Sequence, residues 1–344
     1  MSLATRPDIC GIDEKSQASN ITRLFMSKRT VINLLSYLAM IVLLVIVFAV
    51  FIRKSEIELL CRIDLFSFVV LIGFTVTFYM VGGLQYYALR DMYGIRLEKK
   101  DILLLPVAMN LWSFLIPLQG SAVFFMLFLK HRHKVKISDG LSITIFLYLV
   151  TIFFAGLVGL VFAVIYNLTF SLFSLISLIF LLNPLFVMVG HKIVSRVPEV
   201  KIKFVNSLII FFKKTVSNMN GMWLNYKYVA ISLLLIICRM MVSAFWYMWI
   251  ARILGYKDVP FLSLLLLALW LTVSLIVRFT PNNWGVLQLI SGMMFSLIAL
   301  SPDQGVMISL VASGTLTIVA FTLGAAANFY YLRSWHIKSL KEVG

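Results

Sequence analysis

One uncharged segment of this chain has basic clusters at both of its ends, and this combination leaves few possible folds. Residues Ile102 to Leu129 contain no charged side chain, and Pro117 and Gly120 interrupt the apolar pattern. Basic residues stand on both sides of the segment: Arg90, Arg96, Lys99 and Lys100 before it, and Lys130, Arg132, Lys134 and Lys136 after it. Positively charged loops beside a membrane stay on its cytoplasmic side. Both ends of the segment are therefore predicted to face the cytoplasm.

The segment is too short to cross a membrane twice, because each helical crossing of the hydrocarbon core needs about 20 residues. A single crossing, as one long kinked and tilted helix, is the alternative. It would place one basic cluster outside, together with the basic loop 191–227 and the basic residues of the C-terminus. We therefore predict a re-entrant hairpin over residues 102–129. Irregular backbone at membrane depth persists only where protein or a water-filled cavity covers it, so the hairpin indicates a polar cavity and hence transport.

Composition identifies an all-α polytopic membrane protein. Hydrophobic residues make up 61% of the chain, the mean hydropathy is +0.99, and soluble proteins are usually about half apolar. The net charge of +16 comes mostly from loops predicted to be cytoplasmic, so membrane orientation and anionic lipids explain it better than nucleic acid does. Cys10, Cys61 and Cys238 show neither a disulfide framework nor metal-site spacing. We expect no metal and no cofactor.

The apolar runs predict a single transmembrane domain over residues 31–332, between cytoplasmic tails 1–30 and 333–344. The predicted crossings are Val31–Ile52, Leu65–Leu89, Gly140–Tyr166, Phe170–Gly190, Tyr228–Ile253 and Gly305–Leu332. Residues 260–300 contain a second break. They either cross twice, which gives eight crossings and one hairpin, or form a second re-entrant pair, which gives six crossings and two hairpins.

The longest predicted cytoplasmic loop, residues 191–227, contains an amphipathic helix over Lys201–Met219. Its apolar side chains, such as Phe204 and Leu208, are set against Lys203 and Lys213. A helix of this kind can lie at an anionic lipid surface. It is equally typical of a connector packed on the base of the helix bundle.

Arg239 is the most informative single residue, because it lies about midway along the apolar run Ile231 to Ile250. An arginine at the bilayer centre costs about 2.5–3.5 kcal/mol even on the lenient insertion scale, and it usually faces a cavity or a partner. No Asp or Glu falls in the middle of any predicted span. A guanidinium grips phosphate through two parallel hydrogen bonds, so we predict that Arg239 binds an anionic ligand. A structural arginine bonded to backbone carbonyls is the alternative.

The two breaks share one pattern, a proline followed by a glycine and then an apolar helix. The first is Pro117 to Gly120 and the second runs from Arg278 to Gly285. Helices that start at these glycines inside the membrane would direct a positive dipole end into the cavity. Neutral polar contacts are predicted from Gln119, Asn282, Asn283 and Gln288. Arg278 is either a ligand contact or an interfacial anchor, and both breaks can also be ordinary proline kinks.

Missing motifs narrow the function further. All four histidines lie in loops or tails, so no intramembrane proton relay is visible. There is no phosphate-binding glycine loop with lysine, so the chain does not hydrolyse ATP itself. An integral glycosyltransferase would need acidic residues at the outer face, where Glu56, Glu58 and Asp64 form the one cluster of note. That cluster is more typical of a solvated turn, and we expect no enzymatic activity.

The segment Thr280-Pro-Asn-Asn-Trp-Gly-Val-Leu-Gln288 resembles a signature of the lysylphosphatidylglycerol synthase transmembrane, or flippase-like, family. That signature reads Pro-Gly-Gly-x-Gly, followed three residues later by Glu. Asn110, Pro117 and Gly120 resemble an earlier segment of the same family, and the similarity covers residues 30 to 335. The resemblance implies a role for these residues, together with Pro281 and Gly285, in binding a substrate. It implies translocation of a lipid or lipid-linked sugar, or assistance to envelope polysaccharide assembly.

Several positions depart from the family pattern. Asn282 and Asn283 replace two glycines, but Asn tolerates positive φ better than most residues. Gln288 replaces the glutamate, and an arginine expected near Ala312–Thr315 is missing. The soluble aminoacyl-transfer domain of some relatives is also missing, so lysine transfer to lipids is not expected.

These observations together predict a flippase-like transporter in the bacterial inner membrane, with both termini cytoplasmic. Its expected substrate is a membrane lipid or a polyprenyl-phosphate-linked sugar, whose phosphate pairs with Arg239. Two alternatives stay open. The chain can be an accessory subunit that docks a glycosyltransferase or polymerase through loop 191–227, or an integral membrane enzyme acting on lipid-linked sugars.

Overall fold

The computed structural model describes residues 31, 33–47, 49–50, 58–60, 63–90, 95, 97–116, 119–167, 172–198, 203–274, 276, 279–298 and 300–343. These residues form helices and short connections, with no strand among them. The prediction of an all-α polytopic membrane protein is confirmed.

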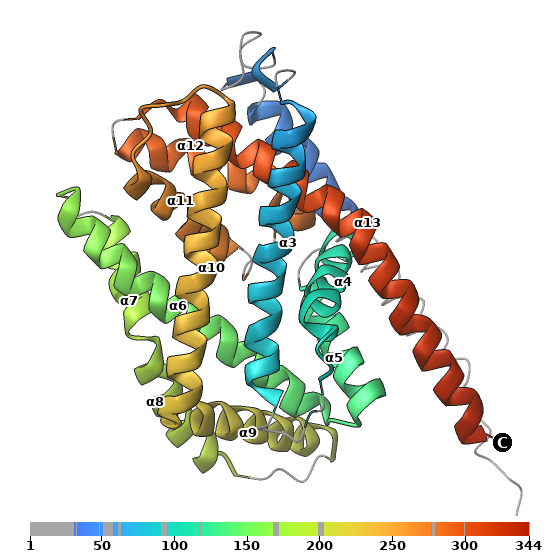
Figure 1. Cartoon of the computed structure of the whole chain (residues 1–344). Helices are drawn as coiled ribbons and strands as arrows, with labels where there is room; N and C mark the ends of the chain where they lie inside the picture. Colours follow the sequence, from blue (N-terminus) through green and yellow to red (C-terminus); the bar gives the residue numbers. More distant parts are fainter. Residues whose placement is uncertain are drawn as a thin grey trace, which may run out of the picture.

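Four long apolar helices connect the two ends of the molecule (Figure 1). They are α3 (Leu65–Ala88), α6 (Ile137–Ile165), α10 (Tyr226–Ile253) and α13 (Pro302–Val343). The bent pair α7 (Leu172–Leu181) and α8 (Asn183–Arg196), which meet at an angle of 46°, makes a fifth candidate crossing when it is counted as one span. The bend falls at Asn183 and Pro184, where proline cannot continue the hydrogen-bond ladder of a helix.

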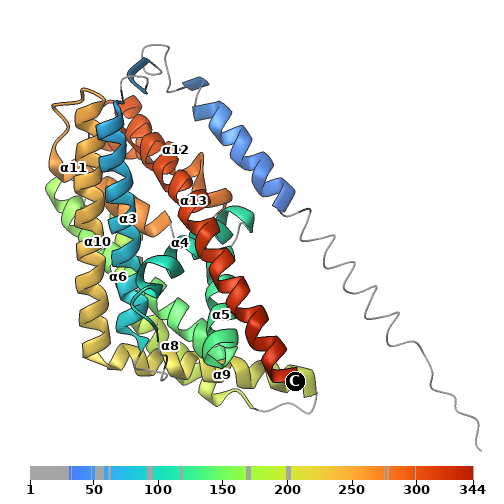
Figure 2. The same ribbon diagram turned by 45° about the vertical axis from the view of Figure 1, so that its right-hand side comes forward.

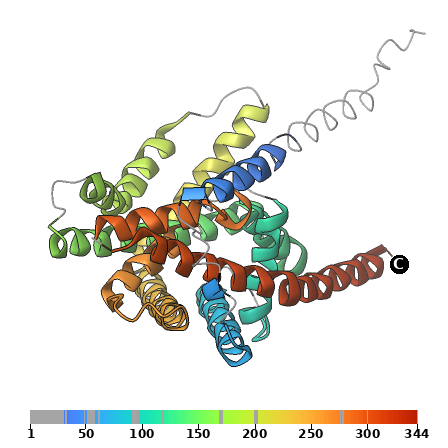
Figure 3. The same ribbon diagram turned by 90° about the horizontal axis from the view of Figure 1, so that it is seen from above.

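The first apolar run adds a shorter apolar helix. Its described helix, Asn33–Val47, rises toward the end of the molecule where α3 begins (Figure 2). Seen from above, α13 crosses the bundle, with α3 and α10 on one side and this first helix on the other (Figure 3). At its C-terminal end α13 continues to Val343, beyond the predicted end at Leu332, because no proline or glycine interrupts residues 325–343.

The described part of residues 102–129 folds as a helical hairpin, and its re-entry into the membrane stays a prediction. Helix α4 (Asp101–Leu115) and helix α5 (Gly120–His133) lie against each other, and each is about 20 Å long at 1.5 Å per residue. Their far ends are joined by a salt bridge from Arg132 Nη1 to Asp101 Oδ1 at 3.2 Å. A chain that leaves and returns at one place keeps both basic flanks at the same end of the molecule, so the single kinked helix is excluded.

Residues 260–300 form a second hairpin at the opposite end of the molecule (Figure 1). Helix α11 (Phe261–Ser274) and helix α12 (Val286–Leu297) contact each other, and the short 3-10 turn η2 (Pro281–Asn283) lies between them. Both helices are shorter than a membrane crossing requires. This arrangement is compatible with the alternative of six crossings and two hairpins, and the choice between the two topologies stays a prediction. The four long helices, the bent pair and the three shorter apolar helices also agree loosely with the predicted number of about eight.

Helix α9 (Lys203–Leu224) lies across the end of the molecule where α10 begins, at a steep angle to α10 (Figure 1). It is fastened to the start of α6, where Asp139 accepts hydrogen bonds from Lys214 Nζ at 2.7 Å and from Asn218 Nδ2 at 3.0 Å. The helix is thus packed on the base of the bundle, as one of the two interpretations requires. Its exposed apolar side chains Val205, Leu208 and Phe212 leave lipid contact as a prediction.

Candidate functional site

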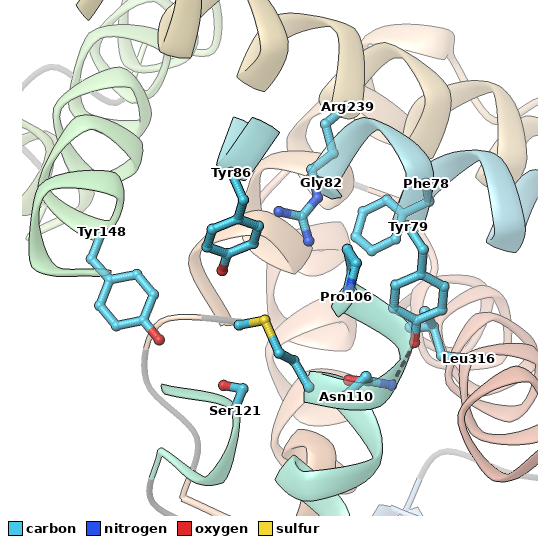
Figure 4. Close-up of a pocket in the computed structure, with 11 residues that line it drawn as sticks. Phe78, Tyr79, Gly82, Tyr86, Pro106, Asn110, Ser121, Tyr148, Arg239 and Leu316 are labelled. Carbon is cyan, nitrogen blue, oxygen red and sulfur yellow. Dashed lines mark hydrogen bonds between the residues drawn. The ribbon is translucent and has the colours of Figure 1, made fainter. Parts of the chain in front are cut away.

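A polar cavity of about 80 Å³ lies beside the first hairpin, and six helices contribute to its walls. Figure 4 shows the side chains that line it. Its polar residues are Tyr79 and Tyr86 of α3, Asn110 of α4, Ser121 of α5, Tyr148 of α6 and Arg239 of α10. A volume of this size holds several water molecules, since each needs about 10–15 Å³ of such space.

Arg239 enters this cavity from the middle of α10, which runs from Tyr226 to Ile253. Its Cζ atom lies 4.2 Å from the centre of the Phe78 ring, a cation–π contact that holds the guanidinium in place. Gly82 lies beside it, and a Cβ atom there would be in ordinary contact with Arg239 Cζ at 3.7 Å. The sequence prediction of an intramembrane arginine that faces a cavity agrees with this placement.

The first hairpin forms the wall opposite Arg239 (Figure 4). Asn110 donates a hydrogen bond from Nδ2 to the Tyr79 hydroxyl at 2.5 Å. Ser121 lies in the first turn of α5, so the positive end of that helix dipole points to the cavity. Among the described residues of the lining none is acidic. The cavity is therefore suited to an anionic group.

The tip of the first hairpin depends on two residues with special backbone requirements. Gln119 precedes α5 in a left-handed conformation, with φ 84°. At Gly120 a Cβ atom would lie only 2.2 Å from the carbonyl oxygen of Trp112, so no other residue fits without a shift of the backbone. The third residue of the predicted break, Pro117, lies outside the described residues.

The Gln119 side chain connects the two hairpins. Its Oε1 accepts a hydrogen bond from the Tyr148 hydroxyl at 3.0 Å, and its Nε2 donates to the backbone carbonyl of Ile276 at 2.6 Å. Ile276 follows α11, so the tips of the hairpins that enter from opposite ends meet near the cavity. Gln119 itself is not part of the described lining of the cavity. It is hydrogen-bonded to Tyr148, and Tyr148 is a lining residue.

The second break is a turn of left-handed residues. Asn282 and Asn283 have φ 48° and 58°, and Gly285 has φ 82°. The prediction that asparagine can replace glycine here is confirmed. Asn283 also fixes the turn with its side chain, which accepts from the Phe279 backbone amide at 3.1 Å and donates to the carbonyl of Ser274. These residues and the buried Pro281 shape the turn, and the described lining of the cavity does not include them.

Gln288 also has a structural role rather than a place in the cavity. It is fully buried, and its Oε1 accepts a hydrogen bond from the Gly285 backbone amide at 2.7 Å. Its Nε2 donates to Ser313 Oγ at 2.9 Å and more weakly to the carbonyl of Ser309. The start of α12 is therefore capped by its own third residue. The expectation that both helix starts open into one cavity is met for α5 alone.

The first helix packs on both hairpin tips. Tyr37 donates its hydroxyl to the carbonyl of Phe114, near the end of α4, at 2.5 Å. Leu43 covers Gly285 so closely that a Cβ atom on that glycine would lie 2.6 Å from Leu43 Cβ. These contacts supply the protein cover that irregular backbone needs at membrane depth.

Sequence reasoning placed Arg239 and Asn110 at the site and missed the tyrosines. Tyr79, Gly82 and Tyr86 are spaced by three and then four residues, which puts them on one face of α3. That spacing is a readable signal of a polar stripe on an apolar helix. Ser121 and Tyr148 carry no such signal. Arg278 lies outside the described residues.

Comparison with known proteins gives one result. The family described as "Lysylphosphatidylglycerol synthase TM region" matches residues 24–324 of the chain. No curated protein and no solved structure matches it.

Proposed function

The chain belongs to the family of the lysylphosphatidylglycerol synthase transmembrane region, and on this basis we propose that it translocates a lipid or lipid-linked sugar with an anionic head group. As a member of that family it is an integral, multi-pass membrane protein. The proposed location is the bacterial inner membrane, with both termini in the cytoplasm. The proposed role is in the biogenesis of envelope polysaccharide or glycolipid, without catalysis by this chain.

One observation carries this proposal: the guanidinium of Arg239 lies in a polar cavity halfway along a membrane-crossing helix. A charge at this depth is costly. It is retained most readily where water or a ligand of opposite charge offsets that cost. An anionic head group that passes through the cavity would supply the opposite charge temporarily.

The other polar groups of the cavity fit the oxygen atoms of a phosphate. The Asn110 amide and the Ser121 hydroxyl supply donors on the hairpin wall, and the dipole of α5 adds a favourable field. The planar guanidinium of Arg239 can hold two phosphate oxygens at once. The apolar tail of the substrate would stay in the surrounding lipid while its head group moves through the cavity.

Membrane-enzyme chemistry is less well supported by the outer acidic residues. Asp64 serves as the N-cap of α3, where its side chain accepts a hydrogen bond from the Ser67 amide at 3.2 Å. The hydrogen bonds from Ser67 lower the pKa of the Asp64 carboxyl. The role of Asp64 as the N-cap of α3 is therefore enough to explain why its carboxylate is kept in the charged form.

The test is a translocation assay in proteoliposomes. Protein is reconstituted with phosphatidylglycerol that carries a fluorescent acyl chain, and dithionite quenches the label in the outer leaflet. A second series uses an analogue that lacks the phosphate. We expect the wild-type protein to move the first probe and to discriminate against the second.

Arg239→Gln is expected to reduce translocation of phosphatidylglycerol by about tenfold or more, since one good charge-assisted contact is worth about 1.5–3 kcal/mol. Arg239→Lys keeps the charge without the planar fork and should retain part of the activity. Arg252→Gln is the matched control, because Arg252 is exposed in the last turn of the same helix. Full activity of a well-folded Arg239→Gln protein would refute the proposal.

A further inference from the structure

A second hollow lies between α3 and α13, both of which also contribute to the walls of the polar cavity. It has a volume of about 240 Å³, and its walls come from α3, the residues just before α3, and α13. Phe68 and Leu71 of α3 face Leu310, Val311 and Ile318 of α13 across it. It is thus an apolar groove between two membrane-crossing helices.

The chemistry of this groove allows only an apolar occupant. Thr315 is the one described lining residue with a polar side chain, and its hydroxyl is already donated to the carbonyl of Ala312 at 2.9 Å. Ile318, one of the lining residues, is 43% exposed, and Leu60, Ile63 and Phe68 are partly exposed. In a membrane these exposed side chains meet hydrocarbon, so the groove opens toward lipid tails.

A glycine keeps the groove open. At Gly314 a Cβ atom would meet no other atom within 4 Å, so the missing side chain leaves space that the helix packing does not need. Several other glycines of the chain are used for close packing. At Gly324 on the same helix, a Cβ atom would lie 2.7 Å from the carbonyl oxygen of Val107. Gly314 differs because its space belongs to the groove.

The groove and the polar cavity both lie along the seam between α3 and α13. On α3, Leu71 lines the groove and Phe78 lines the cavity, two turns or about 10 Å further along. On α13 the two linings are adjacent, with Thr315 in the groove and Leu316 in the cavity. One amphiphile can therefore occupy both sites, with its head group in the cavity and its tail along the seam.

We propose that the groove between α3 and α13 binds a hydrocarbon tail of the lipid whose anionic head group occupies the Arg239 cavity. This inference rests on the proposed function and extends it from the head group to the tail. In this proposal the lipid lies along the seam between α3 and α13, with its tail in the groove and its head group in the cavity. Because the groove is apolar and open at its side, it would bind the tail whatever the chemistry of the head group.

Photocrosslinking tests the proposal. The full-length protein is reconstituted in vesicles of phosphatidylethanolamine and phosphatidylglycerol that contain a trace of phosphatidylglycerol with a diazirine on one acyl chain. After irradiation, adducts are mapped by mass spectrometry of peptides. Adducts on α3 and α13 beside the groove should exceed those at Leu234 and Ile237, which are exposed on α10 without a groove.

Gly314→Leu should fill the groove and reduce these adducts severalfold. Gly73→Leu is the matched control, because Gly73 of α3 also has open space around its Cβ position but lies outside the groove. If Gly314→Leu fails to fold, Gly314→Cys in a background without the three native cysteines can be blocked after purification with alkyl maleimides. Longer alkyl groups should then displace more of the label.

Equal labelling of the groove and of the α10 surface would overturn the inference, as would labelling that persists after the groove is filled. The proposed function fails on a different measurement. Crosslinking reports where the tail binds, whereas the dithionite assay of Arg239→Gln reports whether the head group passes. A groove without label therefore leaves the translocation result standing, and undiminished translocation by Arg239→Gln leaves the groove result standing.

Discussion

Arg132 and Asp101 join the two far ends of the first hairpin, with Nη1 of the arginine 3.2 Å from Oδ1 of the aspartate. The same carboxylate accepts hydrogen bonds from the Tyr331 hydroxyl at 2.9 Å and from the Glu98 backbone amide at 2.9 Å. The pair therefore fastens α4 to α5 and both helices to α13. It fixes the base of a hairpin whose tip borders the polar cavity.

The first prediction concerns the stability that this pair provides. The Asp101 side chain is 1% exposed and that of Arg132 is 12% exposed. Arg132→Gln leaves a buried carboxylate without its cation, a change that costs about 3–5 kcal/mol. Asp101→Asn should cost less, because Arg132 keeps its contact with Glu98 and the amide oxygen can still accept from Tyr331. Thermal unfolding in detergent measures both.

Lys100→Gln is the control for these variants. Lys100 pairs with Glu98 at 2.7 Å, but their side chains are 45% and 52% exposed, and surface pairs contribute at most about 1 kcal/mol. The double variant Arg132→Gln with Asp101→Asn should be more stable than Arg132→Gln alone. Equal loss of stability in the Lys100 and Arg132 variants would contradict the role assigned to the buried pair.

The second prediction concerns Gly120. A methyl group there would lie 2.2 Å from the carbonyl oxygen of Trp112, so Gly120→Ala should displace the tip of the hairpin and destabilise the protein by about 1–3 kcal/mol. At Gly190 in α8 nothing lies within 4 Å of the Cβ position. Gly190→Ala should therefore be neutral or stabilising by up to about 1 kcal/mol, as is usual inside a helix. Similar melting temperatures for the two variants would show that the tip adapts freely.

The first hairpin could be predicted from sequence because its evidence is local. A charge-free segment too short for two crossings, with basic residues on both flanks, admits few paths through a membrane. The second hairpin was left as one of two alternatives, because both topologies put the C-terminus on the same side. The structure shows that α11 packs on α12, which both alternatives allow, so the choice between them stays a prediction.

The site was predictable only in part. Arg239 is conspicuous, since a charge in an apolar helix has few explanations. The contact between Gln119 and Ile276 spans 157 positions in the chain, and nothing at either position points to the other. Gln288 was misleading for a related reason: a polar side chain in an apolar helix can bind a ligand or cap its own helix. Only the fold shows which of these occurs.

The third prediction concerns the coupling of the two hairpin tips. Gln119→Ala removes the bonds to Tyr148 and to Ile276 together, whereas Tyr148→Phe removes only the first. Hydrogen–deuterium exchange should therefore show Gln119→Ala loosening both the start of α5 and the segment between α11 and α12. Tyr148→Phe should affect the first hairpin more than the second. If Gln119→Ala changes exchange in one tip alone, the tips are not coupled through this side chain.

The fourth prediction separates two neighbouring asparagines that share a backbone conformation. Both have positive φ, which glycine adopts without strain. For Asn282→Gly we expect the smaller loss of unfolding free energy, because its buried side chain contributes packing but not the two hydrogen bonds that Asn283 makes. Asn283→Gly loses the side-chain bonds to Phe279 and Ser274, and unsatisfied buried groups cost about 1–3 kcal/mol. Denaturation of both variants in the same detergent measures the difference. If Asn283→Gly proves as stable as Asn282→Gly, backbone conformation alone maintains the turn, and the side chain of Asn283 contributes nothing to it.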